Sequence, residues 1–192
     1  MSLKLIHKEL SLPVERMLQG LAYYMAFNEC TQGGESTEGT YVEEAQKILT
    51  AELGKQQYRI KRELHYSEIV GIQSREEADL AIIKKETEEV ICVLEFKLSS
   101  DTNGGIYKDL NKMKVLPDSI DRLSILLFLH PKPRLKGKLM DPVKLIAKKG
   151  KRVMQNKKYL KEKTYVHIRR VAKAMPSAKT KNPFMAVCIS LD

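Results

Sequence analysis

The stretch EADLAIIKKETEEVICVLEFKLSS, residues 77–100, decides the fold expected for this chain. Its two apolar runs, 78–85 and 89–99, have the length and the β-branched content of strands. The polar segment between them favours a tight hairpin centred near residues 87–88. Apolar side chains in 78–85 point to both faces of the strand, which is typical of a strand buried in the middle of a sheet.

Three charged residues interrupt these apolar runs: Asp79, Glu95 and Lys97. Glu95 and Lys97 are two positions apart, so they share one face of their strand. With a turn near residues 87–88, antiparallel partners have numbers that sum to about 174–176, which places Asp79 opposite Glu95 to Lys97. We therefore expect two carboxylates and one ammonium group to converge at one end of the hairpin.

This combination of charges has a chemical interpretation. Two carboxylates that lie close together repel each other unless a cation sits between them, and a site of few oxygen ligands suits Mg²⁺. The adjoining lysine can orient or deprotonate an attacking water, or stabilise charge on a phosphate. The pattern is typical of metal-assisted hydrolysis of a phosphodiester. The alternative is a structural ion pair between Glu95 and Lys97, with Asp79 capping a turn.

The segment ADLAIIKKETEEVICVLEFKLS resembles the signature of the PD-(D/E)XK nuclease superfamily, which has the restriction-endonuclease-like fold. In that superfamily an Asp starts one strand and a Glu/Asp-x-Lys ends the next. Ala78 stands where the superfamily often has proline. The resemblance implies that Asp79 and Glu95 bind Mg²⁺ and that Lys97 assists the water. It covers roughly residues 39–130.

The superfamily often carries a further glutamate on the helix before the sheet, here within GTYVEEAQKIL. Glu43 and Glu44 compete for this role, and Glu44 lies nearer the edge of the apolar stripe of the helix. We therefore favour Glu44 as a fourth catalytic residue. The alternative is that both are first-turn acids that interact favourably with the helix dipole.

The order of predicted elements favours an α/β fold, with a central mixed β-sheet flanked by helices on both faces. Helices are predicted over 10–29, 40–53, 104–116 and, in a strongly basic region, 141–163. Strands are predicted over 56–67, 78–85, 89–99, 122–131, 164–172 and 184–191. We expect residues 1–192 to form a single nuclease domain, with a core over about 39–130 and a basic C-terminal extension over about 131–192.

Charge is unevenly distributed along the chain. Residues 131–182 contain 18 Lys or Arg and two acidic residues, whereas residues 1–130 contain 16 basic and 21 acidic residues. So basic a stretch attracts polyanions, and duplex DNA is the densest common one. The alternatives are a solvated basic face, RNA or an acidic membrane surface. The candidate DNA-binding residues are Lys148, Lys149, Lys151, Arg152, Arg169 and Arg170.

Other features of the sequence favour a cytoplasmic protein that does not enter a membrane. No secretory signal is recognisable near the N-terminus, and the longest apolar run, LSILLFL, is too short to cross a bilayer. The three cysteines are an odd number without metal-ligand spacing, which favours reduced thiols.

These observations predict a Mg²⁺-dependent endonuclease that acts on double-stranded DNA. The resemblance favours the small cleavage subunit of a heterodimeric type IIS restriction endonuclease, which cuts one strand and acts with a larger recognition subunit. The alternatives are a homodimeric restriction enzyme, a repair or junction nuclease, or a DNA-binding module of the same fold that has lost catalysis. The intact set of Asp79, Glu95 and Lys97 argues against the last of these.

Overall fold

The computed structural model describes residues 5–31, 37–54, 56–71, 74–98, 103–128, 152–154, 165–175 and 184–191. Its helices are the 3-10 helix η1 (Lys8–Leu10), α1 (Ser11–Thr31), α2 (Glu38–Leu53), α3 (Tyr66–Val70) and α4 (Asn103–Met113). Its strands are β1 (Tyr58–His65), β2 (Glu77–Lys84), β3 (Glu89–Leu98), β4 (Asp121–Phe128), β5 (Arg152–Met154), β6 (Tyr165–Ala174) and β7 (Phe184–Leu191). None of the helices in this part of the chain is long and apolar enough to cross a membrane.

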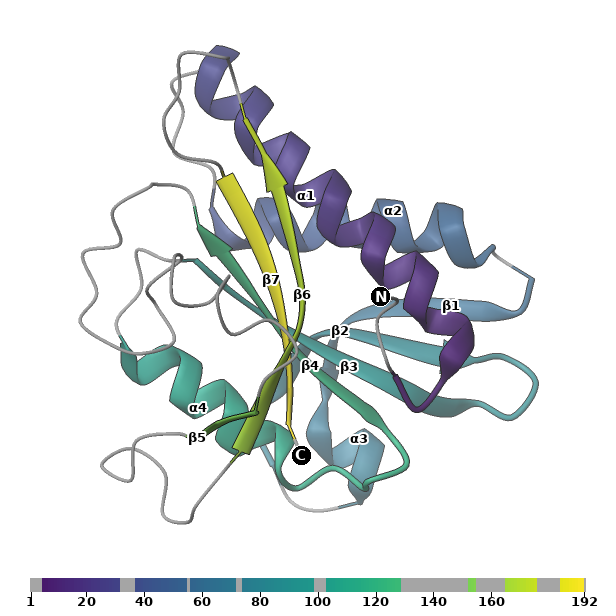
Figure 1. The fold of residues 1–192 in the computed structure, drawn as a ribbon. Coiled ribbons are helices and arrows are strands. Elements are labelled where there is room, and N and C mark those ends of the chain that lie inside the picture. The colour runs from purple at the N-terminus through teal and green to yellow at the C-terminus, as the bar shows by residue number, and fades with distance from the viewer. Residues whose placement is uncertain are drawn as a thin grey trace.

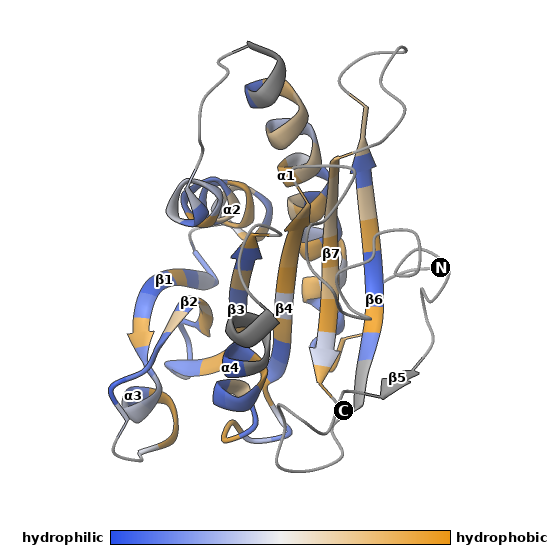
Figure 2. Cartoon of the chain, turned by 90° about the vertical axis from the view of Figure 1, so that its left-hand side faces the viewer, coloured by the Kyte–Doolittle hydropathy of each residue, from blue (hydrophilic) through white to orange (hydrophobic). Residues whose placement is uncertain are grey.

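The strands form one sheet in the order β1-β2-β3-β4-β7-β6-β5. Figure 2 shows most of this order from left to right, beginning with β1. β3 and β4 run parallel, and the other neighbouring strands run antiparallel. The sheet is therefore mixed, as the sequence predicts.

Helices cover both faces of this sheet (Figures 1 and 2). On one face, α1 and α2 pack against apolar side chains that include Leu94 and Leu123. On the other face, α4 contributes Leu110 and Met113 to a second core, to which α3 contributes Tyr66. This arrangement confirms the predicted fold class, an α/β fold with a central mixed sheet and helices on both faces.

The hairpin formed by β2 and β3 also matches the prediction. Leu80 pairs with Leu94, which is a register sum of 174, and the register shifts at a bulge after Ile82. The turn occupies residues 85–88, and Glu88 has a left-handed backbone with φ of 55°. Residues 80–83 are almost fully buried, because both faces of β2 are covered.

Two sequence predictions of secondary structure are wrong in part. Arg152–Met154 fall within the predicted helix 141–163, but they form β5, which pairs with the edge of β6. Pairing with an open sheet edge outweighs the local helical preference of the basic segment. The rest of 141–163 lies outside the described residues. The predicted strand 56–67 ends at His65, where the chain turns into α3.

Candidate active site

Asp79 lies at the start of β2, where the regular pairing with β3 ends. The last regular pair is Leu80 with Leu94, and beyond it the Asp79 Oδ2 atom accepts a hydrogen bond from the Phe96 backbone N–H at 2.7 Å. The carboxylate thus takes the place of a backbone acceptor in the ladder. This contact fixes the Asp79 carboxylate beside β3, at the residue that follows Glu95.

Glu95 is 1% exposed, and both of its carboxylate oxygens have donors. The Tyr66 hydroxyl donates to Oε1 at 2.7 Å, and the Lys112 ammonium donates to Oε2 at 3.0 Å. Lys112 also lies 3.4 Å from Asp109 Oδ1 and donates to the Glu77 carbonyl at 3.2 Å. A buried carboxylate needs such donors, because desolvation disfavours its charged form.

Lys97 lies on the same side of β3 as Glu95 and contacts two other acids. Its ammonium group donates to both oxygens of Glu38 at 3.1 and 3.2 Å and lies 3.7 Å from Asp109 Oδ2. Glu38 Oε2 also accepts from the Leu98 backbone N–H at 3.3 Å. The first residue of α2 is therefore attached to the end of β3.

These contacts join residues from β2, β3, α2, α3 and α4 into one group. We call it the carboxylate–lysine cluster, and its members are Glu38, Tyr66, Asp79, Glu95, Lys97, Asp109 and Lys112. The structure thus brings the predicted residues Asp79, Glu95 and Lys97 to one end of the hairpin.

Burial perturbs the titration of this cluster. Burial is the main cause that raises the pKa of Glu95 to about 8; the Asp79 and Asp109 carboxylates add to the rise, and the Lys112 ammonium opposes it. Burial also raises the pKa of Asp109, against the charge of Lys97. Burial lowers the pKa of Lys112, but the surrounding carboxylates outweigh it and raise that pKa above its ordinary value. The raised pKa values mean that these groups bind a proton more readily than the same groups in water do.

The donor chemistry of the cluster fits a divalent cation. Four carboxylates and two ammonium groups meet there, which leaves a formal excess of two negative charges when all are ionised. The buried Asp109 Oδ2 atom has no hydrogen-bond donor. Within the described residues, no group of three His, Cys, Asp or Glu side chains is arranged to hold a metal ion. Two carboxylates are enough for Mg²⁺, which usually keeps several waters, and Asp79 and Glu95 would be these two.

Glu44 does not provide the helix carboxylate that reaches Lys97; Glu38 does. Helix α2 begins at Glu38, two residues before the predicted start, and Glu44 lies about 9 Å further along the helix axis at the usual rise per residue. The Glu44 carboxylate is 3.9 Å from Lys47, which also contacts the exposed Glu43 at 2.8 Å.

Sequence reasoning also missed three other members of the cluster. Asp109 and Lys112 each precede a buried apolar residue of α4, so their positions at the edge of its apolar face are a usable signal. Tyr66 gave no such signal, because it lies in a segment predicted to be a strand. Its role depends on α3, a helix of five residues.

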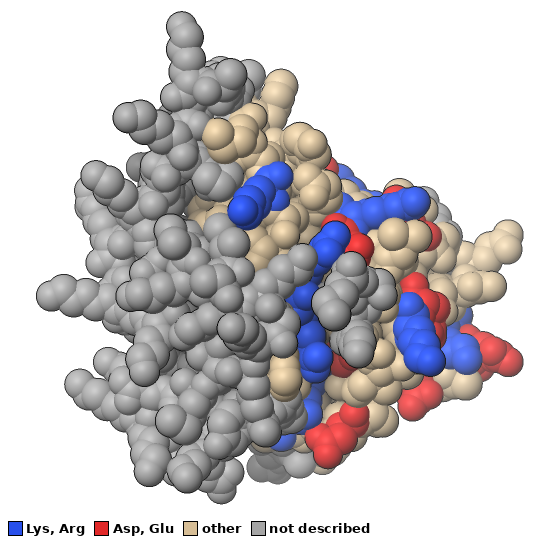
Figure 3. Space-filling view, in the orientation of Figure 1, with Lys and Arg blue, Asp and Glu red and all other residues tan. Residues whose placement is uncertain are grey.

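The predicted DNA-binding residues lie elsewhere. Arg169 and Arg170 are on β6, next to a register shift; Arg169 donates to Ser190 Oγ at 2.6 Å, and Arg170 is 3.6 Å from Glu15 of α1. On the face shown in Figure 3, Lys and Arg side chains form a column in the region of β6. Arg152 belongs to β5, and Lys148, Lys149 and Lys151 lie outside the described residues. Their contact with DNA remains a prediction.

No protein-family model, no curated protein and no solved structure matches this chain. The geometry of the cluster is therefore the basis for the function proposed below.

Proposed function

We propose that the chain is a divalent-metal-dependent endonuclease that hydrolyses phosphodiester bonds in DNA. One observation carries the proposal: Asp79 and Glu95 lie together on neighbouring antiparallel strands, beside Lys97 on the same side of β3. Burial and the neighbouring carboxylates raise the pKa of Glu95, and such a perturbed group marks a candidate functional site.

Each residue of the cluster has a distinct part in this proposal. Asp79 and Glu95 would hold Mg²⁺, and the ion, when bound, would stabilise negative charge on the scissile phosphate. Lys97, held by Glu38 and Asp109, would orient the attacking water or stabilise charge on the phosphate. Lys112 contacts Glu95 and Asp109, so it can leave one carboxylate and remain paired with the other.

The direct test is cleavage of supercoiled plasmid DNA in Mg²⁺ by the purified chain. We expect Asp79→Asn, Glu95→Gln and Lys97→Met each to reduce the rate by about 100-fold or more, because each removes a charge at the reacting phosphate. Glu89→Gln and Lys108→Met are matched controls, since both side chains are exposed and outside the cluster. Cleavage by Glu95→Gln at the rate of the unmodified chain would contradict the proposal.

A second candidate function, DNA binding without catalysis, is favoured by one observation. Both oxygens of Glu95 already accept hydrogen bonds from protein groups, as expected of a structural carboxylate. The same assay separates the two functions. A catalytically inactive module would bind the plasmid in a gel-shift experiment and leave it uncut in both Mg²⁺ and Mn²⁺.

We further propose that the endonuclease belongs to a restriction system and cuts one strand of duplex DNA. The second strand and the sequence recognition would then come from a larger partner subunit, or from a second copy of this chain. A single carboxylate–lysine cluster in the described part of the chain supports cutting of one strand at a time.

A further inference from the structure

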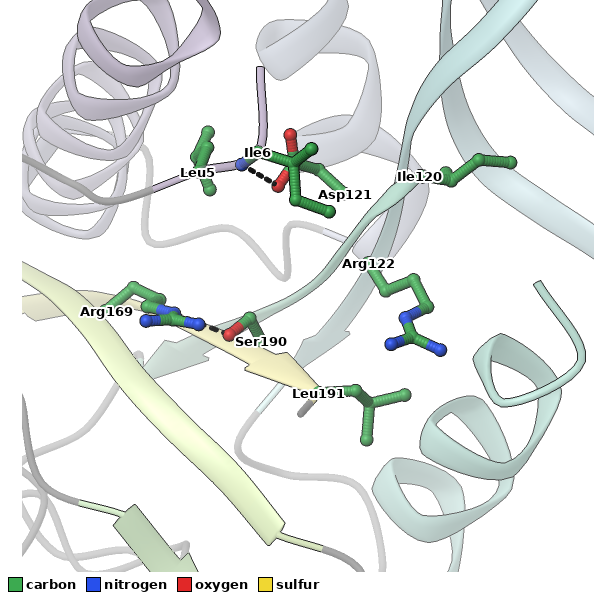
Figure 4. Close-up of a pocket in the computed structure, with 8 residues that line it drawn as sticks. All are labelled: Leu5, Ile6, Ile120, Asp121, Arg122, Arg169, Ser190 and Leu191. Atoms are coloured by element: carbon green, nitrogen blue, oxygen red, sulfur yellow. Dashed lines mark hydrogen bonds between the residues drawn. The ribbon is translucent and has the colours of Figure 1, made fainter. Parts of the chain in front are cut away.

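A pocket lies away from the cluster, at the end of the sheet where β4 begins and β7 ends. It has a volume of about 270 Å³. Its lining residues are Leu5, Ile6, Ile120, Asp121, Arg122, Arg169, Ser190 and Leu191, and they are shown in Figure 4. None of these residues belongs to the carboxylate–lysine cluster. The inference below therefore does not rest on the proposed function.

Arg169 is the side chain in this pocket that lacks an acidic partner. Its Nε–H donates to Ser190 Oγ at 2.6 Å, a contact marked in Figure 4. Among the described residues, no acceptor lies within hydrogen-bonding distance of its two terminal nitrogens, and no carboxylate pairs with it. A guanidinium group has five N–H donors, so four of them remain for a ligand. The register shift between Ile168 and Arg170 sets the position of Arg169, and such bulges are frequent at functional sites.

The acidic residue of the pocket is already engaged. The Asp121 carboxylate accepts hydrogen bonds from the backbone N–H groups of Ile6 and His7, at 2.9 and 3.0 Å. These contacts attach the segment before η1 to β4, and that segment forms one wall of the pocket (Figure 4). Asp121 therefore holds the wall in place and does not pair with Arg169.

The second arginine of the pocket, Arg122, adds positive charge without offering all of its donors. Its guanidinium contacts the Leu116 carbonyl at 3.3 Å and Asp118 at 3.0 Å, and Asp118 is almost fully exposed to solvent. The Asp118 carboxylate balances this charge, so Arg169 is the guanidinium group of the pocket whose remaining donors can receive an anion.

We propose that this pocket binds a phosphate group, with Arg169 as the bidentate donor and the Ser190 hydroxyl as the group that orients Arg169. The planar fork of arginine matches two phosphate oxygens. The apolar walls formed by Leu5, Ile6 and Leu191 leave room for a small attached group such as a sugar, because the volume is near the lower end of ligand pockets. The phosphate comes either from a free nucleotide or from a nucleic-acid strand.

Isothermal titration calorimetry on the full chain, in EDTA and a chloride buffer, tests this proposal. The probes are inorganic phosphate, thymidine 5′-monophosphate, uncharged thymidine, and one short oligonucleotide with and without a 5′-phosphate. We expect saturable one-to-one binding of at least one phosphate probe and none of thymidine. Binding of the monophosphate identifies a free nucleotide as the source, and binding of an oligonucleotide alone identifies a strand.

Variants of the chain separate this pocket from general attraction by a basic protein. Arg169→Gln should weaken binding of the phosphate probe about tenfold, as expected for loss of a charge-assisted contact. Arg59→Gln removes the same charge on β1, where Arg59 pairs with Glu88, and should leave binding unchanged. Arg169→Lys and Ser190→Ala should also weaken binding, and circular dichroism checks that each variant is folded. Equal loss in Arg169→Gln and Arg59→Gln, or no binding of any phosphate probe, would overturn the proposal.

Discussion

In the proposed function, Glu95 is the residue at which a proton and Mg²⁺ would compete most directly. Its pKa of about 8 lies above the ordinary value for glutamate, so below pH 8 a cation must displace a proton to bind there. We predict that affinity for Mg²⁺ rises about tenfold per pH unit below about pH 8 and levels off above it. Calorimetric titrations of Mg²⁺ between pH 6 and pH 9 measure this dependence. An affinity that stays constant over this range would contradict the assignment of Glu95 as a metal ligand.

The same shift predicts how stability depends on pH when no metal is bound. Between pH 4.5, the ordinary pKa of glutamate, and about pH 8, the folded chain holds a proton on Glu95, whereas the unfolded chain releases it. The stability contributed by this proton is present below pH 4.5 and is lost as pH rises through about 8, by on the order of a few kcal/mol. Urea unfolding in EDTA at a series of pH values should show this loss, and Glu95→Gln should remove it.

Lys112 limits the shift of Glu95, because its ammonium group lowers the Glu95 pKa. Lys112→Met should therefore move the midpoint of the Mg²⁺ affinity profile to higher pH. It should also destabilise the fold most above pH 8, where Glu95 ionises without a buried partner. Lys112→Arg keeps the charge and should keep both profiles close to those of the unmodified chain. A pH midpoint that is unchanged in Lys112→Met would show that the contact at 3.0 Å does not control Glu95.

At the level of elements, the hairpin was predictable because the residues that determine it are close together in the sequence. The length and β-branched content of the two apolar runs in residues 78–99 indicate two strands, and the polar turn sets a register that brings Asp79 beside Glu95. Helices α2 and α4 were predictable as elements, but their contacts with the cluster were not. Glu38 lies outside the predicted helix 40–53, so the sequence analysis did not consider it as the carboxylate that contacts Lys97. Helix ends are set by tertiary contacts as well as by capping residues.

The packing of α1 on α2 gives a prediction about two elements. A Cβ atom added at Gly20 of α1 would lie 2.6 Å from Ile48 Cδ1 of α2. Gly20→Ala gains helix propensity of about 0.5–1 kcal/mol, but it also forces Ile48 to move. Ile48→Val removes the clashing Cδ1 atom. We therefore predict that Gly20→Ala is more stabilising in the Ile48→Val chain than in the unmodified chain, by at least about 0.5 kcal/mol. Urea unfolding of the four chains measures this difference, and additivity would contradict the close contact.

At the level of the whole molecule, the two proposed sites lie at different ends of the sheet. The cluster lies near the end of β3, and the phosphate pocket lies where β4 begins, at the opposite end of this parallel pair. Arg169, which the sequence suggested as a contact to the DNA backbone, lies in the pocket and not beside the cluster. Composition reveals a basic chain but not the position of each charge, because the position depends on strand order and on the bulge in β6.

The whole-molecule prediction concerns how many strands one chain cuts. Under the proposed function, one cluster would hydrolyse one phosphodiester at a time, so the chain alone should convert supercoiled plasmid to nicked circles before any linear DNA appears. The nicking rate should be proportional to protein concentration. Adding excess Glu95→Gln chain should leave the nicking rate per active chain unchanged, as long as plasmid sites remain in excess over protein. A homodimer would behave differently: linear DNA would form from the start, and mixed dimers with Glu95→Gln would convert that product to nicked circles. Gel analysis of the plasmid forms over time distinguishes independent chains from a homodimer. Independent nicking would be ruled out if linear DNA formed early and the Glu95→Gln chain suppressed its formation.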